Sequence, residues 1–299
     1  MKKIALSFGA LVAISTLALT SCSAVTPDDG KLRIVASTDV YGSIAEAVTG
    51  NLATVTSIIN DSAQDPHSFE ANAQIQLALS KADVVIENGG GYDDFVDTLL
   101  NGANNPRAIV LNAVRLFGIS ADPPGADFNE HVWYDLPTMG AVATSLSEIL
   151  AALDPANAAR YHSNALTFTT ALVGLEQRVA ELGKRVNGTG VVITEPVPLY
   201  LLDAASLVNR TPTEFTEAIE EGSGVPPAVL LATRDLFRSG AIGAFVYNEQ
   251  TTSAATEQLL TAANDVGVAI VPVTETLPAG RDYLAWMGDN IAALETALQ

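Results

Sequence analysis

Four side chains of types that bind transition metals follow predicted strands in this 299-residue chain. Two are the histidines His67 and His131, and two are the glutamates Glu195 and Glu275. Each lies beyond the C-terminal end of a predicted strand, where open α/β sheets hold their ligands. Two neutral imidazoles and two carboxylates carry a charge of about −2, which neutralises a divalent cation without burying net charge. The spacing therefore predicts a divalent metal site that gathers two ligands from each half of the chain.

The composition excludes several other kinds of site. The chain has one cysteine, Cys22, and three histidines, so a cysteine-rich zinc or iron–sulfur site is excluded and a metal site must use carboxylates. The third histidine, His162, lies inside a predicted helix and is interpreted as structural. A formal net charge of −19 repels phosphate backbones, which excludes nucleic-acid binding as a general role.

Strands and helices alternate in both halves of the chain. The predicted strands cover residues 33–37, 54–59, 83–87 and 108–111, then 191–194, 244–247 and 268–273. The predicted helices cover residues 41–50, 71–80, 92–101 and 137–153, then 198–207, 226–239, 252–265 and 281–298. This alternation predicts parallel sheets covered by helices. The expected fold class is α/β, with two doubly wound domains.

One predicted helix is unusually long. Residues 155–186 contain no interior proline, and about 32 residues of helix span about 48 Å. The alternative is a pair of shorter helices broken near Gly174. As a single element, this helix is expected to join the two domains rigidly. The expected boundaries are residues 31–153 for the N-terminal domain, 154–186 for the linking helix and 187–299 for the C-terminal domain.

The N-terminal residues have the pattern of an export signal. Lys2 and Lys3 precede an apolar run over residues 4–19, which is shorter than the ~20 residues that span a membrane. Leu19-Thr20-Ser21-Cys22 resembles a lipobox, so residues 1–21 are expected to be a lipoprotein signal peptide and Cys22 the lipidated residue. Residues 22–30 would be a tether. The alternative is an ordinary signal peptide with an incidental cysteine. Either way the protein is expected outside the cytoplasm, and with the lipid it is anchored to the cell membrane.

Several segments resemble one protein family. Residues 65–70 (DPHSFE) are similar to the "PH-x-[FY]-E" segment of the metal-specific solute-binding proteins of bacterial ABC transporters, the zinc/manganese receptor group. Residues 130–135 (EHVWYD) resemble the second-histidine segment of that family, and residues 191–207 and 275–294 resemble its third and fourth ligand segments. The resemblance covers residues 31–299. It implies a receptor, not an enzyme, that delivers Mn²⁺ or Zn²⁺ to an ABC transporter permease, and we expect a monomer.

Two residues depart from the zinc-type pattern. Zinc-type members usually carry histidine where this chain has Glu195, whereas manganese-type members carry glutamate. The fourth ligand is usually aspartate in the family and is Glu275 here, with Glu249 as the next candidate. The acidic, histidine-rich loop of many zinc receptors is absent from the sequence. These residues favour Mn²⁺ slightly over Zn²⁺.

Two other functions are considered for the same fold: a metal-dependent hydrolase and a lipid-anchored adhesin or organic-solute receptor. The sequence has no G-x-x-x-x-G-K-[ST], G-x-G-x-x-G or G-x-S-x-G motif. Four protein ligands would also close the open position that a catalytic metal needs. Aromatic residues make up 6% of the chain, which provides little material for an aromatic-lined organic-solute pocket.

Overall fold

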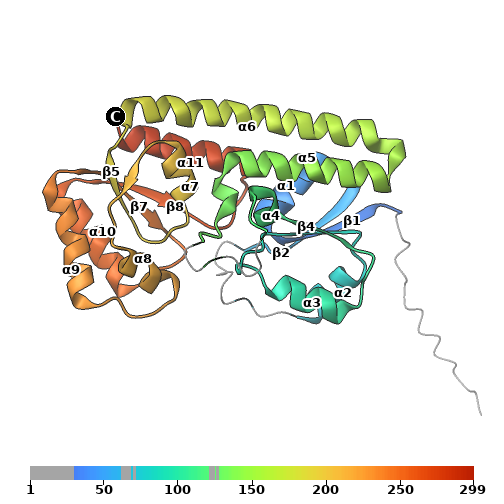
Figure 1. Ribbon diagram of the computed structural model, residues 1–299, viewed down its shortest axis with the longest axis horizontal. Coiled ribbons are helices and arrows are strands. Elements are labelled where there is room, and N and C mark those ends of the chain that lie inside the picture. Colours follow the sequence, from blue (N-terminus) through green and yellow to red (C-terminus); the bar gives the residue numbers. More distant parts are fainter. Residues whose placement is uncertain (1–29, 62–68, 70–71, 121–124, 126–127) are drawn as a thin grey trace, which may run out of the picture. The chain divides into compact units, whose positions relative to one another are not determined.

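The computed structural model describes residues 30–61, 69, 72–120, 125 and 128–299. Within it, Lys31–Gln299 forms one compact unit that contains two four-stranded parallel sheets (Figure 1). The predicted signal peptide, Cys22 and His67 lie outside the described residues. The expected domain boundaries stay a prediction, although the strands of the first sheet precede the predicted linking helix in the sequence and those of the second sheet follow it.

The first sheet has the strand order β2-β1-β3-β4. Its strand β1 is buried on both faces, with Ile34 and Ala36 in one apolar cluster and Val35 in another, which explains the continuous apolar run. Its strands are β1 (Leu32–Thr38), β2 (Ala53–Ile59), β3 (Val84–Glu87) and β4 (Ile109–Asn112). Its helices are α1 (Asp39–Thr49), α2 (Ala73–Ser80), α3 (Phe95–Ala103), α4 (Ala113–Phe117) and α5 (Leu136–Leu153).

The second sheet repeats this layout with the order β6-β5-β7-β8. Strand β7 is also buried on both faces, because Val246 and Phe245 lie in different apolar clusters. The strands are β5 (Gly190–Ile193), β6 (Val208–Asn209), β7 (Ile242–Asn248) and β8 (Ala269–Val273). The helices are α7 (Leu199–Ala204), α8 (Thr213–Glu220), α9 (Pro227–Leu236), α10 (Ala254–Val266) and α11 (Tyr283–Ala297).

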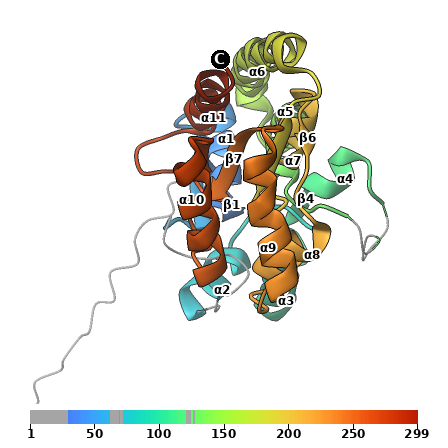
Figure 2. The same cartoon turned by 90° about the vertical axis from the view of Figure 1, so that its left-hand side faces the viewer.

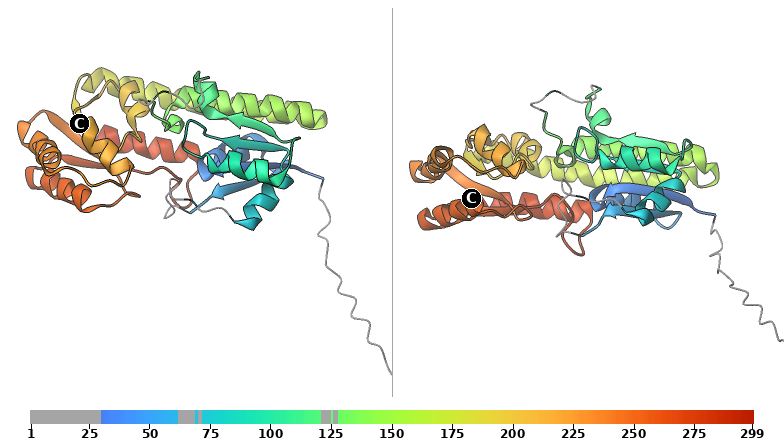
Figure 3. Two further views of the ribbon diagram at one scale, coloured as in Figure 1. Left: turned by 60° about the horizontal axis from the view of Figure 1, so that its bottom comes forward. Right: turned by 90° about the horizontal axis from the view of Figure 1, so that it is seen from below.

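Helix α6 (Ala158–Val186) runs past both sheets and packs against α1, α5 and α11 (Figures 1 and 3). It follows a single 3₁₀ turn at Pro155–Asn157 and continues through Gly174, so the prediction of one long helix is confirmed. The end-on view shows α6 beside α11 (Figure 2). One face of α6 is buried at intervals of three, four or seven residues: Tyr161, Ala165, Phe168, Leu172, Val179, Leu182 and Val186.

Helix α5 is apolar and long enough to cross a membrane by length and composition alone. Its apolar residues have another explanation, because it packs against α1 and α6 and buries Met139, Val142 and Leu146 in the main core. The Asp135 side chain accepts a hydrogen bond from the backbone N–H of Thr138 at 3.0 Å and caps the helix. Helix α5 is therefore a core helix of this unit.

The structure has all seven predicted strands and adds elements that the sequence pattern missed. Strand β6 has two residues and lies at the sheet edge, too short for a periodic pattern. Helix α8 was also missed, because its eight residues (TEFTEAIE) are rich in glutamate and threonine. Helix α7 ends at Ala204, earlier than predicted, because Ser206 adopts a left-handed conformation with φ 55°.

A buried carboxyl group at the end of β3 makes stability depend on pH. Glu87 is 6% exposed, and its Oε1 accepts a hydrogen bond from Asn112 Nδ2 at 2.8 Å. Burial raises the pKa of Glu87 from 4.5 to about 7, and the Asn112 contact offsets only part of this effect. The folded state therefore favours the protonated acid. The free energy of unfolding should fall as the pH rises from about 4.5 to about 7 and level off above that range.

We predict that Glu87→Gln stabilises the protein by about 2 kcal/mol at pH 8, since glutamine keeps an acceptor for Asn112 and carries no charge to bury. The gain should vanish below about pH 4, where the folded and unfolded wild-type proteins both favour the acid. Urea unfolding at the two pH values measures it. Glu148→Gln, an identical change at an exposed position of α5, is the control. Equal gains at both pH values would contradict the assignment.

Candidate metal site

The carboxyl edge of the second sheet brings three buried polar side chains together. Asn248 ends β7, whereas Glu195 and Glu275 each follow a neighbouring strand, β5 and β8, by two residues. The three side chains are 1%, 3% and 2% exposed, respectively. Thr194 extends the ladder, because its N–H donates to the Val246 carbonyl at 3.1 Å and its hydroxyl accepts from the Asn248 N–H at 2.9 Å. The parallel register therefore directs these side chains to one place.

Asn248 holds the two carboxylates side by side. Its Nδ2 donates to Glu195 Oε2 at 2.7 Å and to Glu275 Oε1 at 3.0 Å. The hydroxyl of Thr251 also donates to Glu195 Oε2. Two buried carboxylates repel each other, and neutral donors reduce the cost without removing either charge. A divalent cation is the kind of ligand that balances such a pair.

Glu275 is positioned from both halves of the chain. The N–H groups of Glu275 and Thr276 donate to Gln250 Oε1 at 2.5 and 3.2 Å, which fixes the backbone. From the first half, the hydroxyl of Tyr92 donates to Glu275 Oε2 at 3.3 Å. Burial, together with the charge of Glu275, raises the pKa of Tyr92 well above its usual value. Tyr92 therefore keeps its proton and remains a donor.

His131 lies in the segment before the 3₁₀ turn Val132–Tyr134, and α4 separates it from strand β4. His131 follows β4 in the sequence, as predicted, but the prediction omits the helix α4 that lies between them. The side chain is 1% exposed, and its ring lies edge-on to Trp133 and Tyr92, with centroid distances of 5.0 and 6.0 Å. Tyr92 thus contacts both His131 and Glu275.

Asn129 orients the His131 ring and ties it to the second half of the chain. Its Oδ1 lies 2.6 Å from His131 Nδ1 and accepts from the His131 N–H at 3.2 Å. Its Nδ2 donates to the carbonyl of Pro196, the residue after Glu195, at 3.1 Å. The hydroxyl of Tyr200 donates to the Asn129 carbonyl at 2.6 Å. Because Asn129 takes Nδ1, a metal ion at this ring would bind Nε2.

A third glutamate, Glu220 at the end of α8, lies beside His131. Its Oε1 is 3.9 Å from His131 Nε2, and the ligand atoms of Glu130, His131 and Glu220 all lie within 4.8 Å of one another. Burial and the charges of Glu130, Glu195 and Glu275 raise the pKa of Glu220 to about 8. Sequence reasoning missed this residue because it missed α8. No short motif marks it, since only the tertiary fold brings it to His131.

The predicted ligands therefore fall into two neighbouring sets among the described residues. Glu195 and Glu275 share Asn248, and His131 lies with Glu130 and Glu220. The alternative fourth ligand, Glu249, is exposed. His162 lies on an exposed part of α6, with Nδ1 3.3 Å from the Ser147 hydroxyl.

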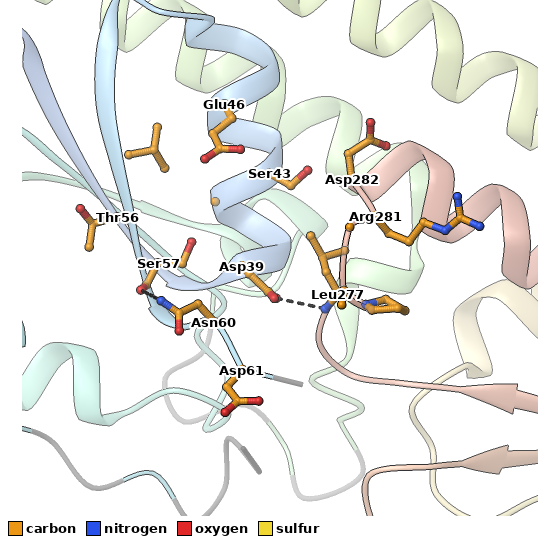
Figure 4. Close-up of a pocket in the computed structure, with 15 residues that line it drawn as sticks. Asp39, Ser43, Glu46, Thr56, Ser57, Asn60, Asp61, Leu277, Arg281 and Asp282 are labelled. Atoms are coloured by element: carbon orange, nitrogen blue, oxygen red, sulfur yellow. Dashed lines mark hydrogen bonds between the residues drawn. The ribbon is translucent and has the colours of Figure 1, made fainter. Parts of the chain in front are cut away.

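A separate cavity of about 800 Å³ lies between α1, β2 and the connection from β8 to α11 (Figure 4). Its lining is mostly acidic or polar and includes Asp39, Glu46, Asp61 and Asp282. The Asp39 side chain accepts from the Leu277 N–H at 3.1 Å, and burial raises the pKa of Asp39 to about 6. This contact links α1 to the segment that follows Glu275. None of the predicted metal ligands in the described residues lines the cavity.

Comparison with known proteins places the chain in a family. Residues 34–297 match the family described as zinc-uptake complex component A, periplasmic. The manganese-binding lipoprotein MntA of Halalkalibacterium halodurans is 27% identical over 183 residues, which span 59% of this chain and 59% of MntA. The manganese ABC transporter substrate-binding lipoprotein scaA of Streptococcus gordonii is 22% identical over 311 aligned positions, covering 97% of this chain and 98% of scaA.

The fold has a counterpart among solved structures. A crystal structure of ZnuA matches with a TM-score of 0.75 at 21% identity, covering 90% of this chain and 100% of the ZnuA chain. The family match extends over nearly all of the compact unit Lys31–Gln299. The chain therefore belongs to the zinc-uptake complex component A family, the metal-binding solute-binding proteins of ABC transporters, and is a transport protein rather than an enzyme.

Proposed function

We propose that this protein captures a divalent transition-metal ion outside the cytoplasm and delivers it, as a monomer, to an ABC transporter permease. The observation that carries this proposal is the buried pair Glu195 and Glu275, held by one amide beside the oriented ring of His131. Buried like charges are costly unless a cation balances them. Manganese is the ion named for the relatives MntA and scaA, and zinc is named for the family, which supports a transition-metal cargo.

The proposed ligands are His67, His131, Glu195 and Glu275. Burial of Glu275 beside Glu195 supports it as the fourth ligand, whereas Glu249 is exposed. His67 is proposed from the sequence resemblance alone. Imidazole suits zinc, iron and nickel, whereas carboxylate oxygens suit harder ions such as manganese. A site with two carboxylates, and with Glu195 where zinc-type receptors carry histidine, therefore favours Mn²⁺, with Zn²⁺ second.

We predict that Glu275→Ala lowers Mn²⁺ affinity at least about 100-fold, because it removes a ligand and leaves Asn248 with only one carboxylate partner. The matched change Glu249→Ala, at the exposed position on the next loop, should leave the affinity within about twofold. Isothermal titration with Mn²⁺ measures both. The reverse result, with loss of binding only in Glu249→Ala, would move the fourth ligand to Glu249.

We predict that Glu195→His shifts the preference toward zinc, raising the Zn²⁺/Mn²⁺ affinity ratio about tenfold or more, because a nitrogen ligand replaces a hard oxygen ligand. Competition titrations of the two ions on the wild-type protein and the variant measure the ratio. Glu195→Gln, which removes the charge but keeps an oxygen, is the control for loss of charge. An unaltered ratio in Glu195→His would contradict the metal assignment.

We further propose that the protein is held at the membrane by lipid on Cys22, as the lipoprotein descriptions of MntA and scaA support. Cys22→Ala removes the thiol that carries the lipid, so the variant should remain unprocessed or be released from the membrane. Fractionation of cells and the mass of the protein are the measurements, with Ser23→Ala as the matched control. A Cys22→Ala protein that is processed and membrane-bound like the control would rule out the lipid anchor.

A further inference from the structure

We infer that Glu220, at the C-terminal end of α8, is an additional ligand that binds the same cation as His131 and raises the preference of the site for Mn²⁺ over Zn²⁺. The inference rests on the proposed function, because it assumes that His131 binds metal. It adds a residue that lies outside every strand-end segment from which the other ligands come. The carboxylate reaches His131 from the second half of the chain.

The distance between Glu220 and His131 fits two ligands of one cation better than a direct hydrogen bond between the two side chains. The 3.9 Å between its Oε1 and His131 Nε2 is too long for a hydrogen bond. Two ligand atoms that each lie about 2.1 Å from one metal ion are at most about 4.2 Å apart, so this separation matches two ligands of one ion. Asn129 takes the other ring nitrogen, so it is Nε2 that faces the carboxylate.

One oxygen of the Glu220 carboxylate is withdrawn from water without a hydrogen-bond donor. Its Oε1 is buried and accepts no hydrogen bond within the described part of the chain, although the side chain as a whole is 23% exposed. A buried carboxylate oxygen without a donor costs free energy, and a cation beside it removes that cost. Glu130, with a ligand atom within 4.8 Å of both His131 and Glu220, makes the place still more favourable for a cation.

Helix α8 holds Glu220 in this position. Phe215 and Ile219 are buried in the second apolar cluster and anchor the helix. Thr216, one turn before Glu220, is also buried, so both residues lie on the covered side of the helix. Glu217 and Glu221 are exposed, which makes Glu221 a matched position of the same type and charge. The position of Glu220 is therefore determined by the packing of the whole helix.

An extra carboxylate changes which ion binds best. Zinc prefers four ligands, whereas manganese accepts a larger number of oxygen ligands. With Glu220 added to Glu195 and Glu275, three carboxylates surround the ion. Three carboxylates exceed the charge of a divalent cation, and the partial exposure of Glu220 lets water solvate the excess. The third oxygen ligand therefore contributes more to Mn²⁺ binding than to Zn²⁺ binding.

The test compares Glu220→Gln with Glu221→Gln in the full-length protein. Competition titrations should show Mn²⁺ affinity reduced about tenfold or more in Glu220→Gln and Zn²⁺ affinity reduced about threefold or less. Glu221→Gln should keep both affinities within about twofold of wild type. X-ray absorption of the Mn²⁺-loaded protein should show one oxygen ligand fewer, or a longer one, in Glu220→Gln only. Thermal unfolding without metal checks that both variants are folded.

Two outcomes would overturn the inference. One is a Glu220→Gln protein with the Mn²⁺ affinity of Glu221→Gln. The other is an equal reduction for both ions with an unchanged absorption spectrum, which would mean that Glu220 acts only through its charge. His131→Ala separates these results from a failure of the proposed function: if it keeps full metal binding, the site itself is wrong, whereas its loss of binding leaves the two Glu220 outcomes decisive.

Discussion

Two negative charges buried next to each other are the constraint on which the rest of this site depends. Glu195 and Glu275 come from the ends of strands on either side of β7, so the strand spacing of a parallel sheet sets their separation. Asn248 can donate to both because it ends the strand between them. Thr251 and Tyr92 also donate to the pair and are likewise neutral, and in the proposed function the transported ion balances the charge.

Asn129, in the first half of the chain, orients groups from both halves. His131 owes its ring position to Asn129, and the same amide bonds the carbonyl next to Glu195. A shift between the halves would therefore disturb the imidazole and the carboxylate together. Helix α6 packs against helices of both halves and resists such a shift, since one continuous helix has no hinge. Movement of loops around the site is thus more compatible with this fold than wide closure.

The sequence pattern predicts elements that are buried on both faces, and it does so with boundaries close to those observed. Strand ends follow from the strands, so Glu195 and Glu275 could be found by position alone. The role of Asn248 could not be predicted in this way, because an asparagine at a strand end has no distinctive spacing. Glu220 could not be predicted either, since α8 is only eight residues long with three apolar residues, and its contact with His131 is set by packing between distant segments. The pattern places His131 after the strand that ends near residue 111 but misses the intervening helix α4.

The order in which the chain is made has a consequence for folding. Helix α1 bonds to residues near the other end of the sequence, because the Ser43 hydroxyl accepts from the Tyr283 N–H, 240 positions later, at 3.0 Å. The Trp133 carbonyl likewise accepts a hydrogen bond from the Tyr283 hydroxyl at 2.7 Å. Contacts of such high sequence separation form late and slow folding. The first sheet pairs only strands from the first 112 residues, so it can form early, whereas α1 and the Trp133 segment gain their partners from Tyr283 only when nearly all of the chain has been made.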